Sequence, residues 1–169
     1  MVEHQFSKLR AAVRFRYPAP MSQKGEFEST LTQYECAISY HPFGHEPEPV
    51  FQFAVPPVVY TVPKDYTVDP LVAAEEAREM VGEKSACIFI PGTKFDARGT
   101  RHGRGGGWYD RFLAAVPRDW LRVGVCTYKE FSREPLTRES WDEPVDRVGV
   151  SCNSGWRFIN THARCATSS

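Results

Sequence analysis

The sequence has no excess of charge of either sign. Lysine and arginine together number 21, aspartate and glutamate also number 21, and the formal net charge at pH 7 is therefore zero. A protein that binds nucleic acid or anionic lipid over its whole surface carries a positive excess. Any binding driven by charge is therefore expected at a local site.

Paired cysteines and long apolar segments are also lacking. The five cysteines form no Cys-x-x-Cys pair, and Cys87 and Cys126 lie in apolar runs typical of buried thiols, so we expect neither a disulfide framework nor a zinc site. The N-terminal stretch MVEHQFSKLRAAVRFRYPAP has no apolar core of signal-peptide type, and no segment has membrane-spanning length. We expect a cytoplasmic protein without membrane contact; a transit peptide remains the alternative for this arginine-rich stretch.

Helical and strand patterns alternate in the second half of the chain. Asp69 and Gly82 are suitable N- and C-terminal caps for a helix that begins with Pro70, and the later apolar runs suit strands buried on both faces. We expect helices over 70–81 and 108–116 and strands over 85–92, 120–128 and 145–151. This order predicts an α/β fold with a mostly parallel sheet. The length of 169 residues suits a single domain, 1–169.

The remaining segments are less regular. Helical spacing of apolar residues predicts a short helix over 6–16, and strands are predicted over 34–41 and 49–55 between many prolines. The tail, 152–169, has no clear period, and we expect it to fray towards its end.

The stretch GTRHGRGGGWYDR (99–111) joins a predicted strand to a predicted helix. Its glycines let the backbone curl around an anion at the helix N-terminus, and Arg101 and Arg104 can add charge-assisted contacts. Asp110 could hold a magnesium ion against a phosphate. The stretch matches neither the P-loop nor the dinucleotide-binding motif. These residues alone favour a phosphate-binding loop, with a flexible structural loop as the alternative.

Two longer motifs identify a family. The stretch IPGTKFDARGTRHGRGGGWYDRFL (90–113) strongly resembles the signature of 5-formyltetrahydrofolate cyclo-ligases, also called methenyltetrahydrofolate synthetases. The segment VGVCTYKEFSREPLTRESWDEPVDRVGVS (123–151) resembles the family's closing segment, in which Asp-x-x-Val-Asp precedes the last strand. The resemblance covers 85–151.

The resemblance implies a three-layer, Rossmann-like α/β sandwich and an ATP-dependent ligase. Such enzymes convert 5-formyltetrahydrofolate, a reduced folate, to 5,10-methenyltetrahydrofolate. ATP phosphorylates the formyl oxygen to an imino-phosphate, a neighbouring nitrogen closes the ring, and ADP and phosphate are released. This chemistry depends on positioning and charge neutralisation.

The resemblance also implies roles for individual residues, with Arg104 as the catalytic cation. The residues expected at ATP are Arg101, His102, Gly103, Arg104, Gly105, Gly106, Gly107, Trp108 and Tyr109, with Arg10 and Arg14 from the N-terminal helix. Those expected at the substrate are Arg104, Gly105, Gly106, Gly107 and Trp108, with Glu46, or alternatively Glu48, on the folate side. Magnesium ligands are expected at Asp110 and Asp142.

Some positions depart from the family pattern or allow a simpler interpretation. His102 stands where the family has leucine, Trp108 replaces a tyrosine, and the folate-side half is shortened. Asp142 also suits a plain turn next to a strand. Asp96 is interpreted as a turn residue.

Three functions remain as hypotheses. The first is a cyclo-ligase, the second a degenerate member that binds nucleotide without turnover, and the third an RNA-binding module that uses the Arg/Gly loop. The neutral net charge disfavours nucleic acid, and we expect a monomer or a weak homodimer. Trp141 and Trp156 are predicted to be packing residues.

Overall fold

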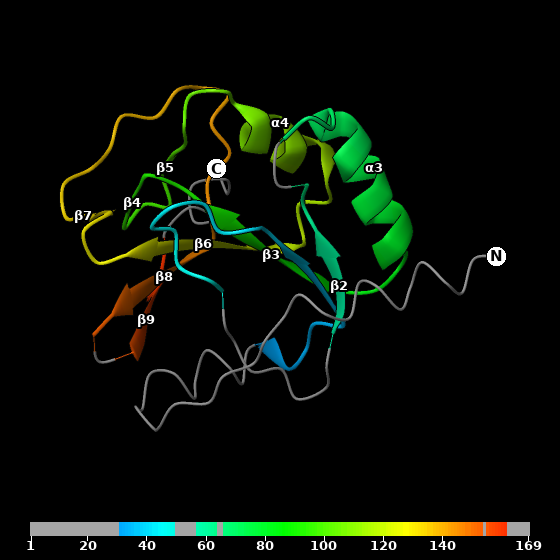
Figure 1. Cartoon of the computed structure of the whole chain (residues 1–169), viewed down its shortest axis with the longest axis horizontal. Helices are drawn as coiled ribbons and strands as arrows, with labels where there is room; N and C mark the ends of the chain where they lie inside the picture. The colour runs from blue at the N-terminus through cyan, green and yellow to red at the C-terminus, as the bar shows by residue number, and fades with distance from the viewer. Residues whose placement is uncertain (1–30, 50–56, 64–65, 154, 162–169) are drawn as a thin grey trace, which may run out of the picture.

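The computed structural model describes residues 31–49, 57–63, 66–153 and 155–161 (Figure 1). The predicted helix over 6–16, with Arg10 and Arg14, lies outside the described residues, as does almost all of the predicted strand over 49–55. None of the helices within the described ranges combines the length and the apolar character needed to cross a membrane.

A six-stranded sheet forms the centre of the molecule. Its strands are β1 (Cys36–Ser39), β2 (Val58–Thr61), β3 (Ala86–Pro91), β6 (Leu121–Thr127), β8 (Arg147–Cys152) and β9 (Gly155–Asn160), arranged in the order β2-β1-β3-β6-β8-β9. Neighbouring strands are parallel except for the antiparallel pair β8–β9. The predicted mostly parallel α/β sheet is therefore confirmed. The tail was expected to have no regular structure, and β9 is a strand that this expectation missed.

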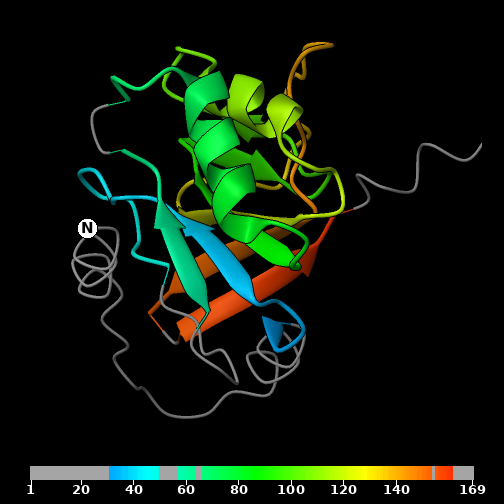
Figure 2. The ribbon, with the colours of Figure 1, turned by 90° about the vertical axis from the view of Figure 1, so that its right-hand side faces the viewer.

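The two long helices of the described residues, α3 (Pro70–Val81) and α4 (Trp108–Ala115), lie side by side on one face of the sheet (Figures 1 and 2). The Asp69 carboxylate accepts a hydrogen bond from the backbone N–H of Leu71 at 2.8 Å, which confirms the predicted cap. Apolar residues of both helices pack on the sheet in one buried cluster. The second helical layer of the predicted sandwich is not among the described residues.

A second, three-stranded sheet combines two strands between β3 and α4 with one strand that follows β6, and it carries the start of the glycine loop. It contains β4 (Lys94–Asp96), β5 (Arg101–His102) and β7 (Phe131–Ser132), in the order β5-β4-β7. Phe95 of β4 is fully buried and connects this small sheet to the main one. Cys36, Cys87, Cys126 and Cys152 are free thiols, so none of the cysteines that the structure describes forms a disulfide.

Substituting Gly124 tests this connection. A Cβ at Gly124 in β6 would overlap the buried ring of Phe95, so Gly124→Ala is expected to destabilise the protein by about 1–3 kcal/mol. Urea unfolding measures the change. Gly106→Ala has open space around the new methyl group and, like Gly124, no positive φ, so it controls for the effect of adding a methyl group to the backbone. Equal losses in the two variants would contradict the packing of Phe95 on β6.

Candidate functional site

The glycine loop, defined here as residues 103–107, connects β5 to the N-terminus of α4. Gly105 and Gly107 have φ values of +97° and +57°, which favour glycine strongly. A Cβ at Gly105, Gly106 or Gly107 would meet nothing within 4 Å, so this backbone borders open space. Gly107 is the N-cap of α4 and supplies no side-chain cap, which leaves the positive end of the helix to an external anion.

A cleft of about 750 Å³ opens around this loop. Every predicted site residue that the structure describes borders it: all residues from Arg101 to Asp110, Glu46, and Asp142. Tyr66 and Trp141 also border the cleft, and neither was predicted as a site residue. The sequence therefore located the cleft, although Arg10 and Arg14 lie outside the described residues.

Trp108 belongs to the packing on one side of the cleft. Its ring stacks on Phe112 at 5.3 Å and contacts Tyr66 at 5.4 Å, and its indole N–H donates to the carbonyl oxygen of Val68 at 2.9 Å. Burial raises the pKa of both Tyr66 and Tyr109. These phenols stay uncharged at neutral pH, so they do not repel an anion in the cleft.

Arg101 turns inward and pairs with Asp110. The two side chains are 4% and 15% exposed, and the Arg101 guanidinium donates to the Asp110 carboxylate at 3.0 Å. A second contact joins Arg101 to the Pro91 carbonyl oxygen at 3.4 Å. The family resemblance predicts Arg101 at the ATP phosphates. In the structure, the hydrogen bond from Arg101 fixes the orientation of the Asp110 carboxylate.

Arg104 points across the cleft to the turn after β1. Its guanidinium donates to Glu46 at 3.0 Å and to the Phe43 carbonyl oxygen at 3.4 Å, and it lies over the Phe43 ring at 4.6 Å. The Arg104 side chain is 51% exposed, whereas Glu46 is 7% exposed. Glu46 therefore holds one edge of an arginine that remains accessible from the cleft.

The opposite wall is the segment that contains Asp142. The backbone N–H of Glu143 donates to Asp110 at 3.2 Å, which ties this segment to the first turn of α4. Asp142 accepts from the backbone N–H of Glu139 at 2.8 Å, so it closes a turn, as its simpler interpretation predicts. Glu143 is held in turn by Arg118 and Arg122.

Buried Asp96 anchors the 133–142 segment to the small sheet. Its carboxylate accepts from the backbone N–H groups of Arg98, Thr100 and Leu136, which confirms the predicted turn and also reaches a distant loop. Burial works to raise the pKa of Asp96, but these hydrogen bonds outweigh it and lower that pKa. The His102 ring forms a hydrogen bond with the carbonyl oxygen of Thr137 at 2.8 Å. The histidine that stands in place of the family's leucine therefore also helps to anchor this segment.

The lowered pKa predicts a loss of stability in acid. Because the folded-state pKa of Asp96 lies below its unfolded value, its contribution is present above about pH 4 and is lost as pH falls through the folded pKa. Asp96→Asn should be less stable than the wild type at pH 7, and this difference in the free energy of unfolding should shrink in acid. Urea unfolding from pH 7 to pH 3 measures this difference, and a difference independent of pH would contradict the role of the carboxylate.

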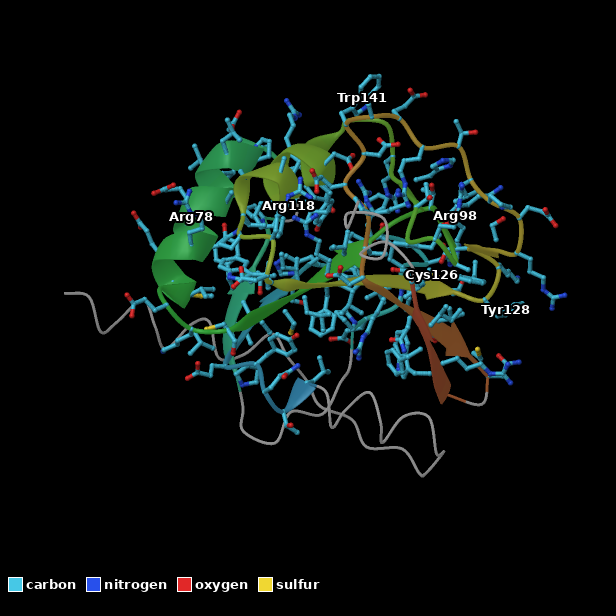
Figure 3. All side chains as sticks on the ribbon, turned by 180° about the vertical axis from the view of Figure 1, so that it is seen from behind. Arg78, Arg98, Arg118, Cys126, Tyr128 and Trp141 are labelled. Carbon is cyan, nitrogen blue, oxygen red and sulfur yellow. The ribbon has the colours of Figure 1, made fainter. Side chains whose placement is uncertain are left out.

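Trp141 contradicts its prediction as a packing residue. Its side chain is 69% exposed, and Figure 3 shows it projecting outward beyond the ribbon. Trp156 fits the prediction better, since it is partly buried and stacks on Phe158. No local pattern distinguishes the two tryptophans, because the exposure of Trp141 depends on where its loop lies.

The fit to a magnesium ion depends on two carboxylates. Within the described residues, no group of three or more histidine, cysteine, aspartate or glutamate side chains could hold a metal ion. Asp110 and Asp142 border the same cleft. One or two carboxylates are typical where magnesium arrives with nucleotide phosphates and keeps several waters. The donor set therefore suits a nucleotide-borne ion.

Part of the chain matches a known protein family. Residues 69–151 match the model of the 5-formyltetrahydrofolate cyclo-ligase family. The match begins at the N-cap of α3 and ends within β8, so it contains the entire glycine loop and Asp142. This part of the chain is therefore similar to the 5-formyltetrahydrofolate cyclo-ligase family, in agreement with the resemblance of the two sequence motifs.

A curated relative carries the same family name. A 5-formyltetrahydrofolate cyclo-ligase of Mycoplasma genitalium is 34% identical over 65 residues, which are 37% of this chain and 36% of that protein. The match thus spans about a third of the length of this curated relative.

Two solved structures are also similar. The 5,10-methenyltetrahydrofolate synthetase of Mycoplasma pneumoniae is 19% identical, with a TM-score of 0.48 and coverage of 75% of this chain and 80% of that chain. The Aquifex aeolicus 5,10-methenyltetrahydrofolate synthetase is 20% identical, with a TM-score of 0.47 and coverage of 100% and 96%.

Proposed function

We propose that this chain is an ATP-dependent 5-formyltetrahydrofolate cyclo-ligase acting as one domain. The observation that carries the proposal is the cleft, in which an exposed arginine, an open glycine backbone and two carboxylates face the N-terminus of α4. This set of groups suits a triphosphate and an oxygen nucleophile. The family match over the same residues supports it.

In the proposed reaction, the formyl oxygen attacks the γ-phosphorus of ATP. An oxygen–phosphorus bond forms, the bond to the bridging oxygen breaks, and ADP leaves. The neighbouring nitrogen then attacks the activated carbon, the carbon–oxygen bond breaks to release phosphate, and the nitrogen loses its proton. Arg104 and the glycine-loop N–H groups neutralise the transferred phosphoryl group in both steps.

The other residues position these groups. Arg101 orients Asp110, and Glu46 orients Arg104 on the folate side of the cleft. Asp110 and Asp142 would hold magnesium, which supplies positive charge next to the phosphates when bound. This arrangement uses positioned charge throughout and needs no covalent intermediate on the protein.

The near-ultraviolet absorbance of the methenyl product tests the proposal. Purified full-length chain is mixed with 5-formyltetrahydrofolate, ATP and magnesium, and each component is omitted in turn. A rise that requires all of them supports the ligase. A flat trace, with ATP still raising the melting temperature, would instead support a nucleotide binder without turnover, the second hypothesis.

Glu46→Gln tests how Arg104 is held. The substitution keeps the shape of the side chain but removes the charge that pairs with Arg104, so Arg104 should sample other positions. We expect turnover to fall by about 10-fold, with a smaller change in the KM for ATP. Steady-state kinetics measures both. Glu48→Gln, an exposed neighbour outside the residues that line this cleft, is the matched control. Wild-type turnover in Glu46→Gln would contradict the role of the pair.

A further inference from the structure

The two walls of the cleft differ in the chemistry that they offer. On one side, Trp108 packs against Tyr66 and the Val68 carbonyl oxygen, and Arg104 reaches Glu46. On the other side, Asp110 is tied to the backbone of Glu143, next to Asp142. The start of α4 therefore lies between a folate-side wall and a wall that carries both carboxylates.

Trp141 stands on the carboxylate wall and precedes Asp142 directly. It borders the cleft while 69% of its side chain is exposed. Exposing a large aromatic ring is unfavourable in the free protein, and a ring at the rim of a cleft offers a flat face for stacking.

The backbone that carries Trp141 is anchored on both sides. The turn from Glu139 to Asp142 is closed by a backbone hydrogen bond at 3.2 Å and by the Asp142 carboxylate at 2.8 Å. Glu143 is fixed to Asp110 and to two arginines. The indole is therefore presented from a fixed position, which reduces the entropy lost when a ligand stacks on it.

We infer that Trp141 is a stacking platform for the nucleobase of the nucleotide bound in this cleft. The inference rests on the proposed function, because it takes the phosphates to lie against the carboxylate wall. A base joined to those phosphates through one ribose is then the planar ring nearest to Trp141. The formyl end of the folate belongs to the Arg104–Glu46 side.

Tryptophan fluorescence gives a direct test, because the four tryptophans differ in exposure. Trp120 is 4% exposed, and Trp108 and Trp156 are partly buried and stacked on other rings, so Trp141 is the accessible reporter. ATP with magnesium should quench wild-type emission, and Trp141→Leu should remove most of this quenching, leaving only the contribution of Trp108, which also lines the cleft. Inorganic tripolyphosphate, which binds through phosphates alone, should leave the emission of Trp141 unchanged.

Affinity measurements complete the test. Trp141→Leu should weaken ATP binding and raise the KM for ATP by about 5- to 150-fold, the range of one lost base–aromatic stack, while tripolyphosphate binding and the KM for folate stay the same. Trp141→Phe keeps a stacking face and should restore most of the ATP affinity.

The outcomes separate the inference from the function on which it rests. Unchanged ATP affinity in Trp141→Leu, or quenching by 5-formyltetrahydrofolate and not by ATP, would overturn the stacking role while turnover by the wild type still supported the ligase. If the wild type binds neither ATP nor tripolyphosphate and forms no product, the proposed function fails, and the inference fails with it.

Discussion

Arg104→Ala is expected to lower the rate of methenyl formation by at least about 100-fold, the usual cost of removing one positioned charge from a transition state. Arg104 is the exposed cation of the glycine loop, and its guanidinium faces the cleft while Glu46 holds one edge. Its removal leaves Glu46, which is 7% exposed, without its ion-pair partner, so the melting temperature should also fall, and the rate is measured well below it. Single-turnover absorbance at saturating ATP measures the chemical step.

Two variants make this prediction specific. Arg133→Ala removes an equally charged, exposed side chain that does not line the cleft, and it should retain wild-type turnover. Arg104→Lys keeps the positive charge but loses the planar guanidinium, so its rate of methenyl formation should lie between those of the wild type and Arg104→Ala. Full activity in Arg104→Ala would remove the central cation from the mechanism.

Asp110→Asn is expected to affect both stability and magnesium dependence. The substitution leaves Arg101 as an unpaired charge with a side chain only 4% exposed, which should cost about 3 kcal/mol of folding free energy. The loss of the carboxylate should also weaken the apparent magnesium affinity by about 10- to 100-fold. Urea unfolding and magnesium titration of the folded protein, each at fixed ATP, measure the two effects separately.

Asp119→Asn serves as the matched control. It removes the same charge from an exposed residue outside the cleft, between α4 and β6, and both measurements should match the wild type. If Asp110→Asn changed stability but left the magnesium titration unchanged, Asp110 would be a structural partner of Arg101 and no metal ligand.

Local signals account for the part of the fold that was predictable. The cap at Asp69, the proline that follows it and the apolar runs of β3 and β6 act over a few residues, and they identified α3 and the buried centre of the sheet. In β9, Trp156 and Phe158 are partly buried and alternate with exposed Arg157, a weak period-two signal that was missed in the polar tail.

The contacts that organise the site depend on distant residues. Arg104 and Glu46 are 58 positions apart, and Asp96 reaches Leu136 across 40. Such pairs depend on how distant loops meet in the folded chain, and no local sequence pattern encodes these contacts. The glycine loop was located from its composition, because glycine and arginine before a helix act locally. The inward orientation of Arg101 depends on the β4–β5 hairpin, and sequence alone did not reveal it.

The fate of the formyl oxygen tests the central claim most directly. 5-Formyltetrahydrofolate labelled with oxygen-18 in the formyl group is converted by the wild-type chain with ATP and magnesium, and the released phosphate is analysed by mass spectrometry. Transfer of the phosphoryl group to that oxygen predicts one labelled oxygen in each phosphate for each methenyl product. Labelled oxygen in water, with unlabelled phosphate, would contradict the proposed phosphorylation in this cleft.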